Sequence, residues 1–154
     1  MIDRSSGNAM FEVSLKFVVK DTKGRILLLA MPDNDQMAGY FDLPGGRIKE
    51  SEKKCSLKNV LNRELMEELG SNVQLKIRES PVAIGRHSYP SKETGKTMWI
   101  FWVLFEALYE GGEVQISSEH KSYSWVKVSA SNLSKLFTKG PLDVMSNYMT
   151  GLLS

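Results

Sequence analysis

Three glutamates stand at positions from which their side chains could hold a cation. Glu64, Glu67 and Glu68 are three and four residues apart near the end of the stretch 43–70. At that spacing the side chains of a helix project into one patch, where like charges cost about 0.2–0.5 kcal/mol per pair. A cluster of this kind is better explained when a cation lies among the carboxylates. Hard oxygen ligands suit Mg²⁺, with Mn²⁺ as an alternative.

The helix that must carry these glutamates is indicated by its leucines, which recur every four residues from Leu57 to Leu69. Upstream, Pro44-Gly45-Gly46 is expected to form a loop, because glycine permits a positive φ and close approach of the backbone to a ligand or metal. A glycine loop before a carboxylate-rich helix predicts metal-assisted attack on a phosphoryl group. A solvated helix face with no chemical role is the alternative.

The order of these residues resembles the signature of the Nudix hydrolases, G-x5-E-x7-R-E-U-x-E-E-x-G-U, in which U is aliphatic. Gly46 and Glu52 match its first part, and its second part is matched by Arg63, Glu64, Leu65, Glu67, Glu68 and Gly70. Ten residues rather than seven separate Glu52 from Arg63, which indicates a three-residue insertion. Ser71 stands at the last aliphatic position.

The resemblance implies the ligands of a metal site. Glu64, Glu67 and Glu68 would hold Mg²⁺, or Mn²⁺, and the backbone carbonyl of Gly46 would be a further oxygen ligand. Arg63 would orient a glutamate through a charge-assisted hydrogen bond, and Glu64 and Glu52 are the two candidates. Glu52, Gly45 and Gly70 would have supporting roles.

The resemblance also suggests a general base and a substrate surface. Glu119 matches a glutamate that in many Nudix hydrolases precedes a Trp-Val strand and reaches the metals or acts as base. A glutamate of the helix, Glu64 above all, is the alternative base. Tyr40 and Phe41 fall where the family has an aromatic segment near the substrate, although both could equally be strand core. Arg86 is a further candidate for substrate binding.

Composition sets limits on the class of protein. The 154 residues fit a single domain, here expected over residues 11–154, and residues 1–10 fit a flexible N-terminus or a tag remnant. A formal net charge of +2 gives no reason to expect a nucleic-acid or membrane partner. Cys55 is the only cysteine, so no intramolecular disulfide can form. A cytoplasmic protein, monomer or homodimer, with a nucleotide as its small-molecule partner, is the expectation.

The pattern of apolar residues predicts an α/β fold. The stretch 97–108 is apolar on both faces of an expected strand, so it should be covered on both sides. One face would carry Trp99, Phe101, Val103 and Phe105, and the other Trp102 and Leu104. Together with the resemblance, this predicts a Nudix-type α/β/α sandwich with a mixed sheet. The helix that carries the glutamates should begin between Glu50 and Ser56, and Glu52 should lie near enough to Arg63 to pair with it. Further strands are expected at 11–19, 26–30, 73–77, 81–87 and 123–126, and helices at 133–137 and 142–153.

The function that follows is a Mg²⁺-dependent hydrolase that cleaves the diphosphate linkage of a nucleoside diphosphate joined to a moiety X. X could make the substrate a nucleotide sugar, a dinucleotide or a modified nucleoside triphosphate, and the loops around Asp33, Ser91 and Glu119 would select it. A catalytically inactive domain that binds nucleotides or regulates is the second hypothesis. Ser51, where many relatives have glycine, and the insertion favour it, whereas the complete set of carboxylates argues against it.

Overall fold

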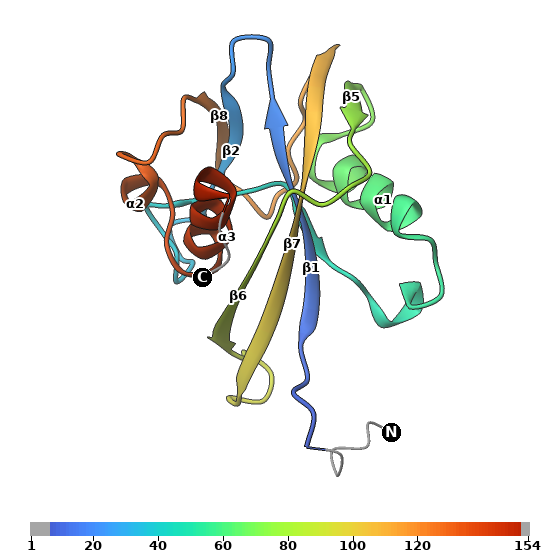
Figure 1. The fold of residues 1–154 in the computed structure, drawn as a ribbon, viewed down its shortest axis with the longest axis vertical. Coiled ribbons are helices and arrows are strands. Elements are labelled where there is room, and N and C mark those ends of the chain that lie inside the picture. The colour runs from blue at the N-terminus through green and yellow to red at the C-terminus, as the bar shows by residue number, and fades with distance from the viewer. Residues whose placement is uncertain (1–6, 152–154) are drawn as a thin grey trace.

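The computed structural model describes residues 7–151, which form one mixed sheet with helices on both of its faces (Figure 1). The sheet has eight strands. They are β1 (Glu12–Lys20), β2 (Ile26–Ala30), β3 (Phe41–Asp42), β4 (Gly45–Arg47), β5 (Val73–Ile77), β6 (Ala83–Pro90), β7 (Thr97–Gly112) and β8 (Ser122–Val126). The helices are a 3₁₀ turn η1 (Glu50–Glu52), α1 (Leu57–Leu69), α2 (Leu133–Leu136) and α3 (Lys139–Thr150).

The two long strands β1 and β7 form the centre of the sheet and run parallel, from Glu12 opposite Ile100 to Lys20 opposite Leu108. The strand order along the main path is β3-β2-β1-β7-β5, and every pairing other than β1 with β7 is antiparallel. β4 pairs with β1, β6 with β7, and β8 with β2. The mixed sheet agrees with the predicted fold class.

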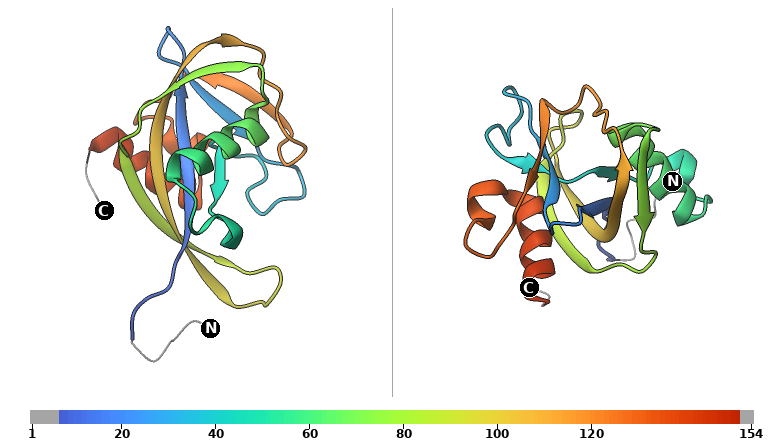
Figure 2. Two further views of the ribbon diagram at one scale, coloured as in Figure 1. Left: turned by 90° about the vertical axis from the view of Figure 1, so that its right-hand side faces the viewer. Right: turned by 90° about the horizontal axis from the view of Figure 1, so that it is seen from above.

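The alternation of side chains along β1 divides the core between the two faces of the sheet. Leu15, Phe17 and Val19 pack on one face beneath α1, whereas Val18 packs on the other face with residues of α2 and α3. The view from above shows α1 and the pair α2 and α3 on opposite sides of the strands (Figure 2). The predicted α/β/α sandwich is therefore confirmed.

Helix α1 begins one residue later than the predicted range. Its N-cap is Ser56, whose hydroxyl accepts a hydrogen bond from the Asn59 amide at 3.2 Å, and Leu57 in the first turn is exposed. Of the ten residues between Glu52 and Arg63, the first four connect η1 to α1 and the other six belong to the first turns of the helix. Gly70 ends the helix at φ +86°, where other residues are strained.

Two local expectations were wrong. Gly45 and Gly46 do not form a loop, because they belong to β4 and lie opposite Lys16 and Leu15 of β1. A Cβ on Gly45 would lie 2.1 Å from the Leu15 carbonyl oxygen, so only glycine permits this pairing. Trp99 is 46% exposed, because the hairpin of β6 and β7 projects beyond the helices (Figure 1). The strand is therefore covered on both sides only nearer its middle.

The first described residues lead into β1. Residues 7–10 precede β1 without helix or strand, and residues 1–6, for which flexibility or a tag was expected, lie outside the described residues.

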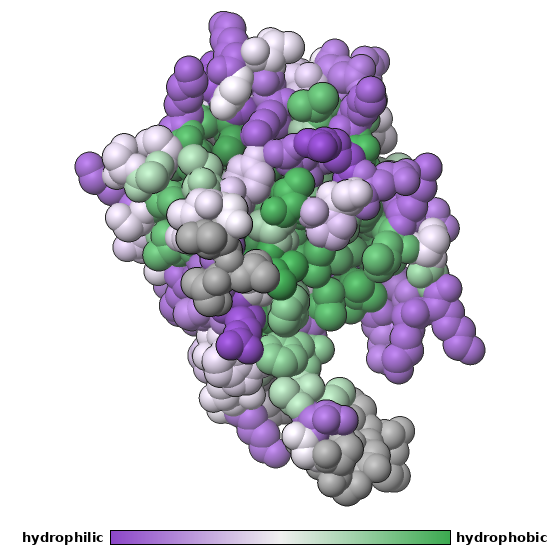
Figure 3. All heavy atoms as spheres, in the orientation of Figure 1, coloured by the Kyte–Doolittle hydropathy of each residue, from purple (hydrophilic) through white to green (hydrophobic). Residues whose placement is uncertain are grey.

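Figure 3 shows hydrophobic residues gathered over the open part of the sheet between α1 and α3, with hydrophilic residues around them. Of the helices in the described part, none is long and apolar enough to cross a membrane.

Candidate active site

The glutamates of α1 line a cleft of about 780 Å³. It is lined on the side of the glutamates by β4, Lys49 and α1, and elsewhere by the β2–β3 and β6–β7 connections and the loop before β8. Its polar lining includes all three glutamates of the cluster, Arg63, Gly45, Gly46 and Glu119, and its apolar lining includes Met31, Met37, Met98, Ile100 and Trp102. The predicted catalytic and metal-binding residues are thus brought to one surface.

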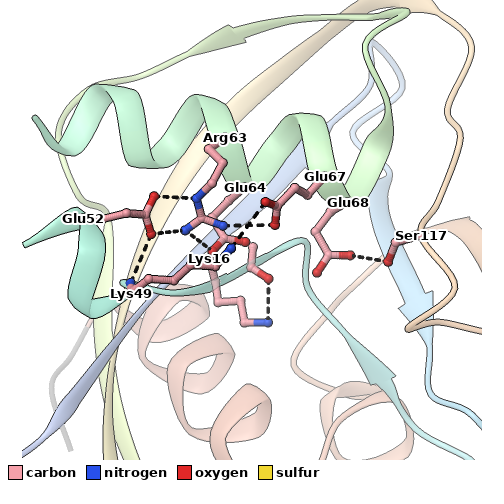
Figure 4. Close-up of polar contacts among 9 residues, drawn as sticks. Lys16, Lys49, Glu52, Arg63, Glu64, Glu67, Glu68 and Ser117 are labelled. Carbon is pink, nitrogen blue, oxygen red and sulfur yellow. Dashed lines mark hydrogen bonds and ion pairs between the residues drawn. The ribbon is translucent and has the colours of Figure 1, made fainter. Parts of the chain in front are cut away.

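Arg63 is the centre of a carboxylate cluster (Figure 4). Its Nε and Nη2 donate to the two oxygens of Glu52, each at 2.5 Å. Its Nη2 lies 2.8 Å from Glu64 Oε1, and its Nη1 donates to Glu67 Oε2 at 3.0 Å. The guanidinium therefore contacts both partners that the sequence proposed for it and Glu67 as well, and its fork geometry allows all of these contacts at once.

Burial gives the glutamates different electrostatic environments. Glu64 and Glu68 are buried, whereas Glu67 is exposed and pairs with Lys49 at 3.6 Å. Burial raises the pKa of Glu64 above the ordinary value, although Arg63 acts in the opposite direction. The pKa of Glu52 is lowered, chiefly by its hydrogen bonds to Arg63.

Gly46 is placed where a side chain would meet Glu64. A Cβ on Gly46 would lie 2.5 and 2.7 Å from the two carboxylate oxygens of Glu64, so the glycine is needed for the close approach of β4 to α1. Gly70, at the other end of α1, faces Gln115, whose Cβ would lie 3.0 Å from an added one. Gly45, Gly46 and Gly70 therefore all have packing reasons to be glycine.

Glu119 lies on the rim of the cleft, in the loop before β8. Its side chain is exposed, and its backbone amide donates to Ser117 Oγ at 3.4 Å. Ser117 in turn donates to Glu68 Oε2 at 3.4 Å (Figure 4). The loop is therefore tied to α1, and this contact brings Glu119 to the same side of the molecule as the cluster.

The three residues suggested for substrate binding do not line the cleft. Phe41 packs against the core beside α3, and Tyr40 is 36% exposed outside the cleft. Arg86 is exposed on β6, where its backbone amide donates to Asp143. Their placement supports the alternative of strand core for Phe41 and gives no support to a substrate contact by any of the three. All three loops expected to select X line the cleft: those at Ser91 and Glu119 through these residues themselves, and the loop around Asp33 through its neighbours Met31, Asp35, Gln36 and Met37.

Sequence reasoning missed three charged side chains on the cleft floor. Lys16 of β1 donates to Asp42 Oδ2 at 3.1 Å, and both side chains are buried. His120 is buried between two carboxylates, with Nε2 3.6 Å from Asp42 Oδ2 and Nδ1 3.2 Å from Glu68 Oε2, the second pair not being aligned for a hydrogen bond. The one indication of this group in the sequence is the position of Lys16 between the apolar residues Leu15 and Phe17 of an expected strand.

The buried pairs shift the pKa values of Asp42 and His120 in opposite directions. Burial alone would raise the pKa of Asp42, but Lys16 and His120 outweigh it and lower the pKa to about 2. Burial alone would lower the pKa of His120, but the carboxylates of Asp42 and Glu68 raise it to about 9. Both shifts favour the charged form of the group.

Acid should remove the stability that ionised Asp42 supplies. Because its folded pKa of about 2 lies below the ordinary 3.8, this contribution is complete above pH 4 and is lost as pH falls toward 2. Asp42→Asn should therefore lower the free energy of unfolding near pH 6, and the difference from wild type should shrink by about 2 kcal/mol by pH 2. Urea unfolding at several pH values measures this, and a difference that does not change with pH would contradict it.

The donor set of the cleft fits a hard divalent cation. Within residues 7–151 no three His, Cys, Asp or Glu side chains converge as a metal cage. Arg63, Lys49 and His120 instead lie against the glutamates. The oxygens nevertheless belong to three carboxylates on one wall, beside a glycine backbone that comes close to one of them. Oxygen ligands of this kind suit Mg²⁺ or Mn²⁺, which need few protein ligands and also bind phosphates.

This chain is similar to known proteins over most of its length. The family model described as NUDIX domain matches residues 10–147. Nucleoside triphosphatase NudI of Escherichia coli O139:H28 is 28% identical over 115 residues, which are 68% of this chain and 74% of the relative.

Two solved structures show the same fold. The crystal structure of the MutT protein from Methanosarcina mazei Go1 has a TM-score of 0.61 at 26% identity, and the match covers 92% of this chain and 91% of the MutT chain. The NUDIX domain of Shewanella oneidensis NrtR, solved as a complex with ADP ribose, has a TM-score of 0.62 at 17% identity, with 97% and 91% covered.

Proposed function

The chain belongs to the Nudix family, and from that membership we propose that it is a Mg²⁺-dependent hydrolase of a nucleoside diphosphate linked to a moiety X. The observation that carries the proposal is the cleft in which Glu64, Glu67 and Glu68 lie together with Arg63. Candidate substrates are nucleotide sugars, dinucleotides and modified nucleoside triphosphates. The relatives named above are a nucleoside triphosphatase and a domain that binds ADP ribose, and both kinds of ligand belong in the first test.

The carboxylates of α1 and the carbonyl of Gly46 would hold Mg²⁺, with Mn²⁺ as a possible replacement. When bound, the cation neutralises charge on the diphosphate, polarises a phosphoryl oxygen and lowers the pKa of water. Glu52 keeps Arg63 in place through two hydrogen bonds, and Arg63 in turn keeps Glu64 and Glu67 on the cleft wall. This arrangement orients the ligands before substrate arrives, which is where much of the rate would come from.

Hydrolysis also needs a group that accepts a proton from the attacking water. The water oxygen forms a bond to phosphorus while the bond from phosphorus to the bridging oxygen breaks, and the proton goes to a carboxylate. Glu119 and Glu64 are the two candidates, because both line the cleft. We propose Glu119, since its exposed side chain makes no ion pair with another described residue.

Glu119→Gln should lower kcat by about 10²-fold or more and change KM little, because a general base contributes about 10²–10⁴-fold. The exposed side chain has no packing role, so the melting temperature should stay near that of wild type. Steady-state kinetics over a range of Mg²⁺ concentrations measures both constants. An unchanged kcat would reassign the proton acceptor to Glu64, and a raised KM alone would make Glu119 a contact to X.

The two neighbouring glycines should separate folding from activity. Gly45→Ala places a Cβ 2.1 Å from the Leu15 carbonyl oxygen at φ +128°, so it should lower the free energy of unfolding by at least about 2 kcal/mol. Gly46→Ala meets only the end of the Glu64 side chain, so the protein should fold. Glu64 must then move, and a shift of about 1 Å can lower kcat about 10²-fold.

Urea unfolding and kinetics on both glycine variants test this division. A Gly46→Ala protein with the kcat of wild type would show that the approach of β4 to Glu64 has no part in the reaction. A Gly45→Ala protein as stable as wild type would contradict the packing reason given for that glycine.

A further inference from the structure

Four buried polar side chains, in which a nitrogen base alternates with a carboxylate, cross the floor of the cleft. They are Lys16 of β1, Asp42 of β3, His120 of the loop before β8, and Glu68 of α1. Adjacent members are 3.1, 3.6 and 3.2 Å apart. The reaction proposed above uses only Glu68, so the other three have no assigned role.

Asp42 lies between Lys16 and His120 in this row of side chains, and both of its carboxylate oxygens contact other groups of the protein. Oδ1 accepts a hydrogen bond from the Leu43 amide at 2.7 Å. Oδ2 accepts from Lys16 Nζ at 3.1 Å and lies 3.6 Å from His120 Nε2. A carboxylate with these partners is held in one orientation and is poorly suited to bind a ligand directly.

On one side, Asp42 holds Lys16 against the backbone that leads into β4. Lys16 Nζ also donates to the carbonyl oxygens of Leu43 at 3.2 Å and Gly45 at 3.4 Å. Gly45 immediately precedes Gly46, whose own carbonyl is a proposed ligand, and Leu43 lies three residues before Gly46. The ammonium group thus fixes the peptide that carries one half of the proposed cation site.

On the other side, Asp42 holds His120 against α1. The ring nitrogen that does not face Asp42 lies 3.2 Å from Glu68 Oε2, and Ser117 Oγ donates to the same oxygen at 3.4 Å. The His120 side chain is only 5% exposed, so the ring has little room to turn away. The imidazole thus fixes Glu68, which belongs to the second half of the proposed site.

We propose that Asp42 is the positioning residue of this active site, because its one carboxylate sets Lys16 on the β4 backbone and His120 on Glu68. The inference rests on the proposed function, since it concerns the ligands of the proposed cation. Partners of metal ligands typically change metal affinity about 10–100-fold when they are removed. Asp42 acts on ligands from two elements, β4 and α1, and both should lose their geometry together.

The test is direct Mn²⁺ binding, measured by electron paramagnetic resonance without substrate. Asp42→Asn keeps the size of the side chain and removes its charge, and it should weaken Mn²⁺ binding about 10–100-fold. Asp21→Asn is the matched control, because Asp21, like Asp42, accepts a backbone amide hydrogen bond and pairs with a cation, here Arg25 in the β1–β2 turn. The control should bind Mn²⁺ as wild type does, even if its melting temperature falls.

A second variant tests whether Asp42 acts through His120. His120→Gln alone should also weaken Mn²⁺ binding, and it leaves the Lys16–Asp42 pair in place. In the double variant of Asp42→Asn and His120→Gln, the loss should be smaller than the product of the two single losses, because both changes break the same contact to Glu68. The single variant His120→Gln keeps the test informative if Asp42→Asn does not fold.

Several outcomes would overturn the inference. If Asp42→Asn or His120→Gln bound Mn²⁺ like wild type, the contacts of Asp42 would stabilise the fold without positioning the metal ligands. If the losses in the double variant multiplied fully, Asp42 would not act through His120. A wild-type protein that binds no Mn²⁺ would instead contradict the proposed function, and the inference would fall with it.

Discussion

Glu68→Gln should lower kcat at least about 10²-fold and weaken Mn²⁺ binding, while the protein stays folded. Glu68 is only 5% exposed and faces the cleft beside His120 and Ser117. Glutamine fills the same volume but supplies no negative charge. A bound cation contributes several kcal/mol to the transition state, and the loss of one charged ligand removes a good part of that.

Glu79→Gln is the control for Glu68→Gln. Glu79 is exposed and pairs with Lys58 at 3.3 Å, outside the cleft. The control should have the kcat and Mn²⁺ affinity of wild type, because an exposed ion pair contributes at most about 1 kcal/mol. A Glu68→Gln protein with full activity would remove Glu68 from the set of metal ligands.

Arg63→Gln should reduce both stability and activity, because it leaves three carboxylates without their common partner. The buried Glu64 loses its contact at 2.8 Å, and Glu52 loses two hydrogen bonds. Removal of one partner from a buried ion pair costs about 3–5 kcal/mol, and the partial exposure of Arg63 reduces this to about 2 kcal/mol. The displaced glutamates should lower kcat about 10²-fold.

Two further variants make the Arg63 result specific. Arg63→Lys keeps the charge but cannot form the fork of hydrogen bonds, so its kcat should lie between those of wild type and Arg63→Gln. Arg78→Gln removes an exposed arginine that pairs with Glu106 at 3.0 Å, and it should leave kcat unchanged. Full activity in Arg63→Gln would mean that substrate and cation alone place the glutamates.

The spacing of residues was enough to predict the helix that carries the site. Val60, Leu61, Leu65 and Leu69 are buried as their period indicates, and Glu64 and Glu67 reach one surface because they are one turn apart. Strands β2 and β5 have the predicted ends. These features depend on near neighbours in the chain, which is why the sequence determines them clearly.

Contacts between distant segments were beyond the reach of spacing alone. Lys16 lies in an apolar strand, and a polar residue there is already explained by the alternation of buried and exposed side chains. The sequence therefore gives no sign of its partner Asp42, which is 26 residues away. His120 belongs to a polar loop, where the sequence pattern does not indicate which side chain is buried. The Gly45-Gly46 pair was expected to form a loop because glycine is common in loops, but here glycine permits close strand pairing.

The most direct test of the account is hydrolysis of a nucleotide panel with and without Mg²⁺. The panel should contain nucleoside triphosphates, ADP ribose, nucleotide sugars and dinucleoside polyphosphates, with release of phosphate or nucleoside monophosphate as the readout. We expect cleavage of at least one diphosphate linkage with Mg²⁺, loss of that activity with a chelator, and recovery when Mg²⁺ is added back. Hydrolysis at full rate in chelator-treated protein would contradict the central claim.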